Sequence, residues 1–101
     1  MIHEIRTYIP HSGKADALRE RFLTSVRPIF ARLGIDLVAT YANPDAPEEM
    51  VYLTRFEAME QRDRLWAAFK TDPEWAAIKS ESETNGPLLK EQRITLLEVI
   101  G

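Results

Sequence analysis

The stretch IDLVATYANPDAPEEMVYLTRFE, residues 35–57, decides how the rest of the chain is read. It contains two runs rich in β-branched and aromatic residues, 35–42 and 50–57, separated by the loop NPDAPEE. Runs of this composition on either side of a segment with Asn, Pro and Asp predict two strands joined as a hairpin. The fold then depends on what precedes and follows this hairpin.

Upstream of the hairpin, the pattern predicts a strand followed by a long helix. Residues 2–9, IHEIRTYI, form the strand and end at turn residues. Residues 14–33 carry apolar side chains in steps of three and four, which is typical of an amphipathic helix. Gly34 is placed to end this helix, and Pro28 should bend its last turns, because proline cannot donate to the carbonyl four residues earlier.

Downstream, the chain predicts two helices, 58–69 and 73–82, and a last strand, 92–100. The order is therefore strand, helix, strand, strand, helix with its appendage, strand. This is the ferredoxin-like βαββαβ motif of the α+β class, in which an antiparallel four-stranded sheet carries both helices on one face. With 101 residues we expect a single domain, 1–101.

The second and third strands place apolar or bulky residues on both sides, for example Leu37 and Tyr41 against Val38 and Ala42. A sheet with only one covered face should instead alternate between apolar and polar residues. No residues are left in the chain to cover the second face. We therefore expect a homodimer that packs sheet against sheet through a two-fold isologous interface.

Composition excludes several classes of function. The net charge is only -3, and the basic residues are scattered among acidic ones, so no nucleic-acid partner is expected. No stretch approaches the ~20 apolar residues that a membrane span requires. The first ten residues resemble neither a signal nor a transit peptide. The absence of cysteine suits a reducing compartment, so we expect a cytoplasmic protein.

Three segments, in this order and spacing, resemble the NIPSNAP family. They are HEIRTYIPHSGKADALRERF at 3–22, VRPIFARLGI at 26–35 and TDPEWAAIKSES at 71–82. The resemblance implies a dimeric α+β barrel, but it implies no reaction, because the family has no agreed catalytic role. We expect a homodimer that binds a small molecule or has a structural role. The same barrel is shared by antibiotic-biosynthesis-type and heme-degrading monooxygenases, which supply an enzyme as the alternative.

Glu4, Arg6 and Tyr8 alternate along the first strand and should point to one face of the sheet. They could line a pocket, with Arg6 holding an anionic or carbonyl group and Tyr8 donating a hydrogen bond. On the alternative interpretation they form a structural ion pair at the dimer seam or at the sheet edge, since a buried charge must be paired. Arg55 in the third strand is a further candidate, and the sequence does not fix its side relative to Arg6.

The enzyme alternative requires a cavity between the sheet and the helices. Its predicted lining is Tyr8, Tyr41, Trp66 and Trp75. A cofactor-independent monooxygenase is compatible with such a cavity, because it needs mainly apolar walls and a proton relay or an activated substrate.

No cofactor is expected for this protein. Neither His3 nor His11 has a partner residue at the spacing of a zinc site, such as a second histidine four residues away on a helix. The segment after Trp66 contains no histidine, which excludes a heme ligated by His there. No glycine-rich loop for a nucleotide occurs either.

The segment FKTDPEWAAIK, 69–79, concentrates polar residues and a tryptophan, yet it predicts a helix start. Asp72 should be the N-cap and Pro73 the first helical residue. Trp75 should then anchor the helix against Phe69 or form a wall of the cavity.

Overall fold

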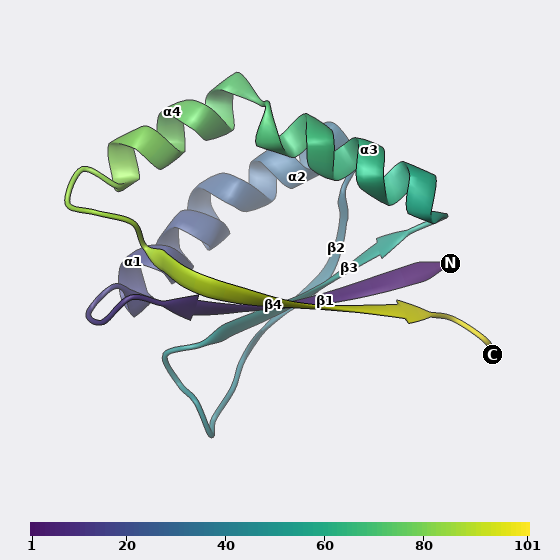
Figure 1. Cartoon of the computed structure of the whole chain (residues 1–101), viewed down its shortest axis with the longest axis horizontal. Helices are drawn as coiled ribbons and strands as arrows, with labels where there is room; N and C mark the ends of the chain where they lie inside the picture. Colours follow the sequence, from purple (N-terminus) through teal and green to yellow (C-terminus); the bar gives the residue numbers. More distant parts are fainter.

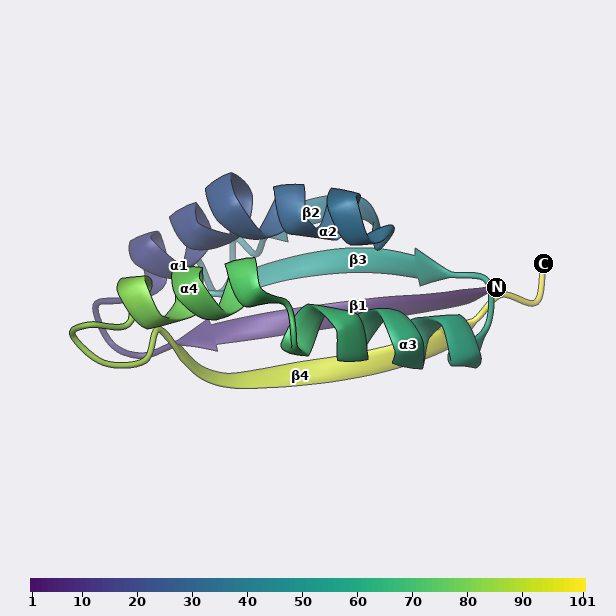
Figure 2. The same ribbon diagram turned by 90° about the horizontal axis from the view of Figure 1, so that it is seen from above.

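The computed structural model describes all 101 residues. A four-stranded antiparallel sheet, in the order β2-β3-β1-β4, carries every helix on one face (Figures 1 and 2). The elements in chain order are β1 (Ile2–Pro10), α1 (Ala15–Arg21), η1 (Phe22–Val26), α2 (Arg27–Leu33), β2 (Asp36–Ala42), β3 (Met50–Phe56), α3 (Met59–Lys70), α4 (Pro73–Ser82) and β4 (Leu89–Glu98). The predicted ferredoxin-like α+β fold is confirmed.

The sheet register settles which side chains face the helices. β1 lies in the middle of the sheet and pairs with β3 and β4, so that Glu4 lies opposite Thr54 and Arg6 opposite Tyr52. Burial alternates along β3, and Tyr52 and Thr54 are fully buried. Because strand residues alternate between faces, Glu4, Arg6 and Tyr8 all point toward the helices.

The helix predicted over 14–33 differs from the structure in one respect. It is interrupted at η1, a π-helical turn in which the N–H of Arg27 bonds to the carbonyl of Phe22, five residues earlier. Pro28 therefore falls in the first turn of α2, where its missing N–H removes no helical bond. The irregular turn, η1, therefore lies before Pro28, whereas the prediction placed a bend in the turns after it. Gly34 ends α2 in the left-handed conformation, with a φ of 87°, as predicted.

The last strand also starts earlier than predicted, at Leu89 instead of residue 92. Pro10 pairs with Leu89 across a register shift after Ile9. β4 is an edge strand with nearly all its residues exposed, so polar residues such as Lys90 and Glu91 are tolerated on it and hide its start from a reading of the hydrophobic pattern.

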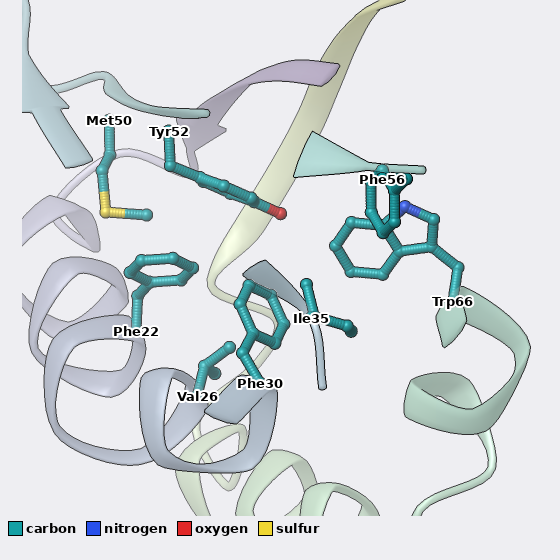
Figure 3. Packing of buried hydrophobic residues seen from close by; sticks show 8 residues of the cluster. All are labelled: Phe22, Val26, Phe30, Ile35, Met50, Tyr52, Phe56 and Trp66. Carbon is teal, nitrogen blue, oxygen red and sulfur yellow. The ribbon is translucent and has the colours of Figure 1, made fainter. Parts of the chain in front are cut away.

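The core is mainly aromatic and packs between the helices and the sheet (Figure 3). The ring of Tyr52 stacks on Phe22, with centroids 4.7 Å apart, and Phe30 meets Trp66 edge to face at 5.4 Å. Trp66, on α3, also packs against Phe56 at the end of β3. Such pairs add about 0.5–1.5 kcal/mol each beyond the area they bury.

The opposite face of the sheet carries no helix (Figure 1). The register places on it Ile5, Val51, Leu53, Tyr41 and Leu97. Tyr41 and Leu97 are 49% and 47% exposed. None of the helices has the length and apolar composition needed to cross a bilayer.

Candidate functional site

The polar row on β1 forms an ion-pair network beneath α3. The carboxylate of Glu4 is fully buried, and its two oxygens accept from Nε of Arg6 and Nε of Arg62. Arg6 also donates to Gln92 at 3.2 Å, and its guanidinium lies 4.0 Å from the centre of the Trp66 ring. Two of the five N–H donors of Arg6 are therefore bonded within the chain. The ion pair lies on the helix-facing side of the central strand β1, and not at the edge of the sheet.

Arg62 completes the network from α3. Burial acts to lower the pKa of Arg62, but hydrogen bonds from its guanidinium to Glu4 and Asp63, and the charges of both, outweigh burial and raise it. The pairing satisfies a buried carboxylate that would otherwise be strongly unfavourable.

A cavity of about 200 Å³ lies between the sheet and the helices, and no residue of this network is in its lining. Four aromatic side chains line it, and Trp75 stacks on Phe69 with centroids 5.0 Å apart. The full lining is Tyr8, Leu18, Arg21, Phe22, Val26, Phe69, Trp75, Lys79, Glu83, Pro87 and Leu89. These residues come from β1, α1, η1, α3, α4, the loop after α4 and β4. The cavity is thus assembled from both ends of the sequence.

Trp75 is held in place by the start of α4. Asp72 accepts from the backbone N–H of Trp75 at 3.1 Å, and Pro73 is the first residue of the helix. Nη2 of Arg32 lies 2.8 Å from both carboxylate oxygens of Asp72, and this hydrogen bonding lowers the pKa of Asp72. The predicted roles of Asp72 as N-cap and Trp75 as an anchor against Phe69 are confirmed.

Polar groups at the cavity are mainly donors. Arg21 pairs with Glu83 at 2.7 Å and lies 5.0 Å from the centre of the Trp75 ring. Lys79 has no ion-pair partner within the chain. The only carboxylate in the lining, Glu83, is therefore already neutralised by Arg21.

The phenol of Tyr8, which lines the cavity, is hydrogen-bonded to the buried phenol of Tyr52, which does not. The hydroxyls of Tyr8 and Tyr52 lie 2.7 Å apart. Burial raises the pKa of Tyr8, although the hydrogen bond with Tyr52 and the charges of Arg6 and Arg21 act in the other direction. Burial also raises the pKa of Tyr52, to well above its usual value. Both side chains are neutral hydrogen-bond donors at pH 7.

The profile of the NIPSNAP family matches residues 3–99 of the chain. The chain belongs to the NIPSNAP family. Comparison with curated proteins gives no match.

Solved structures of other NIPSNAP proteins share the fold of this chain. An uncharacterized NIPSNAP domain protein from Burkholderia xenovorans is 19% identical, with a TM-score of 0.83 over 99% of this chain and 95% of that one. A NIPSNAP family protein from Agrobacterium tumefaciens is 16% identical, with a TM-score of 0.81 over 96% and 90%. An antibiotic biosynthesis monooxygenase is 9% identical, with a TM-score of 0.68 over 100% of both chains. At these identities the similarity shows the fold alone.

The residues predicted for the site fall in three places in this NIPSNAP chain. Tyr8 and Trp75 line the cavity. Glu4 and Arg6 belong to the ion-pair network, and Trp66 packs between that network and the core. The remaining two lie on the other side of the sheet, because Arg55 is opposite His3 and Tyr41 is opposite Val51. Arg55 pairs there with Asp36 at 2.9 Å. A ligand-binding role for these residues stays a prediction.

Several residues of the NIPSNAP cavity were not among the predicted ones. Arg21 lies three residues after Leu18, on the apolar face of its helix, and a charge at such a position was a usable signal. Lys79 lies one helical turn after Trp75, which was a second signal. No pattern in the sequence indicated that Glu83 would reach Arg21 across 62 positions.

Proposed function

We propose that this NIPSNAP protein is a homodimer that binds a small, mainly apolar molecule in the cavity between its sheet and helices. The observation that carries the proposal is the lining, in which Tyr8, Phe22, Phe69 and Trp75 surround one space. Packed cores leave few voids larger than a water molecule. Apolar walls with a few polar groups are the usual make-up of a ligand pocket, and the volume lies below the ~300–1,000 Å³ of sites for drug-sized ligands.

The homodimer is supported by the face of the sheet that no helix covers. Leu53 lies at its centre, opposite Ile5 on β1 and Ala39 on β2. Exposed contiguous apolar surface on a small protein marks an interaction site. A second copy of the same face is the self-complementary partner that a two-fold axis provides.

The binding proposal is tested with three ring compounds that share one body: 4-methylbenzoate, 4-methylbenzamide and p-xylene. Binding is followed by NMR through the indole N–H of Trp75. In the native protein we expect at least one of the three to shift this signal in a saturable way. Leu89→Phe fills the cavity from β4 and should abolish the shift, because Leu89 is a half-buried wall residue.

Ala31→Phe is the matched control, because Ala31 is exposed on α2 and lies away from the cavity lining. It should bind as the native protein does. If none of the three compounds moves the Trp75 signal at millimolar concentration, the proposal is wrong.

A second candidate is a cofactor-independent monooxygenase, and the similarity to an antibiotic biosynthesis monooxygenase supports it. In such chemistry the substrate itself supplies the electrons, takes up one atom of O₂ and releases the other as water. The residues of the cavity support binding better, because a reaction of this kind is started by removing a proton from the substrate. Tyr8 and Tyr52 are held protonated, and Glu83 is paired with Arg21. Oxygen uptake with hydroquinones distinguishes the two candidates, and uptake that Leu89→Phe abolishes would favour the enzyme.

A further inference from the structure

The direction of the hydrogen bond between Tyr8 and Tyr52 follows from burial. Tyr52 is fully buried, and the hydroxyl of Tyr8 is its only hydrogen-bond partner. If Tyr8 donated to Tyr52, the proton of Tyr52 would be buried without an acceptor, which is unfavourable. If Tyr52 donates to Tyr8, each proton has an outlet, because Tyr8 lines the cavity. The favoured order therefore runs from Tyr52 to Tyr8 and from Tyr8 into the cavity.

A hydroxyl that accepts one hydrogen bond becomes a stronger donor in the next, since hydrogen bonds in a chain polarise one another. Tyr8 therefore presents a polarised donor to whatever occupies the cavity. The bond is made in a site of low polarity, where hydrogen bonds are stronger than in water. The matching group on a ligand is an oxygen acceptor, and an anionic oxygen gives the strongest bond.

The charges around the cavity point to the same kind of ligand. Arg21 and Glu83 neutralise each other, and Lys79 remains as an unpaired cation at the rim. The lining therefore has one positive charge in excess and no free carboxylate. A ligand with a single negative charge would complete this balance.

We propose that the cavity binds a small organic anion, with one or two rings as its apolar body and a carboxylate or similarly acidic oxygen as its head. This inference rests on the proposed binding function. Tyr8 donates to the anionic head, Tyr52 polarises Tyr8, and Lys79 supplies the counter-charge. The aromatic walls formed by Phe22, Phe69 and Trp75 favour a ring over an open chain as the body.

The test ranks the three ring compounds already named and adds hexanoate, which has the same head on an open chain. We expect 4-methylbenzoate to bind at least about ten-fold more tightly than 4-methylbenzamide, p-xylene or hexanoate. Tyr8→Phe should weaken binding of 4-methylbenzoate about ten-fold and change that of p-xylene less than about two-fold. Lys79→Gln should weaken the two carboxylates, 4-methylbenzoate and hexanoate, and leave 4-methylbenzamide and p-xylene unchanged, and the effect should shrink at high salt. Arg64→Gln is the control for loss of a positive charge, because Arg64 is exposed on α3 and lines neither this cavity nor the groove beside Trp75 and Lys79.

Tyr52→Phe decides the direction of the hydrogen bond by the sign of its effect. With Tyr52 as the donor, its loss leaves Tyr8 less polarised, and affinity for 4-methylbenzoate should fall about two- to three-fold. With Tyr8 as the donor, the same change would free the proton of Tyr8 and raise the affinity. A rise would therefore overturn the relay.

The outcomes also separate this inference from the proposal beneath it. The native protein could bind 4-methylbenzoate and p-xylene equally well, and Leu89→Phe could abolish binding of both. This result would overturn the proposal of an anionic ligand, but the proposed binding function would stand. Tighter binding of hexanoate than of 4-methylbenzoate would overturn the ring-bearing body. Failure of all three ring compounds to bind would overturn both proposals.

Discussion

Glu4 joins the middle of the sheet to α3 through two arginines that lie far apart in the sequence. One of them, Arg6, shares its strand and its face, and this much could be predicted from the alternation of β1. The other, Arg62, comes from a helix 58 residues later. No local pattern reveals which helical side chain will reach a buried carboxylate, so the network could be predicted only in part.

Arg6→Lys should destabilise the protein while leaving ligand binding in the cavity nearly intact. Lysine is a point charge and cannot replace the separate bonds that Nε and Nη1 of Arg6 make to Glu4 and Gln92. Breaking a buried pair costs about 3–5 kcal/mol when one partner is removed, so about 1–3 kcal/mol is expected when the charge is kept. Chemical denaturation gives the free energy of unfolding.

Arg64→Lys is the control, because Arg64 is exposed and forms no ion pair within the chain. It should unfold like the native protein. Lost affinity for 4-methylbenzoate in Arg6→Lys, with unchanged stability, would instead give Arg6 a direct role in binding.

At the scale of elements, α4 depends on the residue that precedes it, its N-cap. Asp72 caps the helix and pairs with Arg32 of α2, so it links two helices that the chain order keeps apart. The cap could be predicted, because Asp followed by Pro is a strong start signal. The partner could not, and neither could the π turn at η1, because the apolar pattern of residues 14–33 continues through it.

Asp72→Asn should make the stability of the folded protein depend less on pH in the acid range. The pKa of Asp72 is lowered in the folded protein, so the unfolded chain takes up a proton first, near the ordinary value of about 3.9. The stability from this carboxylate is therefore present above pH ~4 and is lost as the pH falls through the lower folded-state pKa. Asparagine keeps the capping bond and removes the charge. Melting temperatures between pH 7 and pH 2 measure the difference.

Glu74→Gln serves as the comparison, since Glu74 is an exposed neighbour that also contacts Arg32. It should leave the acid profile almost unchanged. An Asp72→Asn profile parallel to that of the native protein would contradict the assignment.

At the scale of the whole molecule, the fold could be predicted because the order of elements admits few alternatives. The open face of the sheet could be predicted as well, from strands with apolar residues on both sides. The cavity could not be delineated, because its walls come from separate parts of the chain. Tyr41 and Arg55 illustrate the limit, since their residue types suit a site while the register places them on the opposite face.

Leu53→Glu should convert the homodimer into a monomer. Leu53 lies at the centre of the open face, where two copies would have to bury like charges against each other. Sedimentation equilibrium should give twice the 11.6 kDa of one chain for the native protein and 11.6 kDa for the variant. Met59→Glu replaces an exposed apolar residue at the start of α3 and should remain dimeric. A native protein that stays monomeric at millimolar concentration would refute the dimer.

The helix that roofs the cavity contains no buried residue, although its two ends are fastened by Asp72 and by the pair of Arg21 with Glu83. An element that buries so little opens at a lower free energy than the strands beneath it, and its amide protons exchange sooner than those of β1. Local unfolding of this one short segment would widen the way into the cavity. An occupant that contacts Trp75 would slow hydrogen exchange in that segment before it affected the rest of the fold.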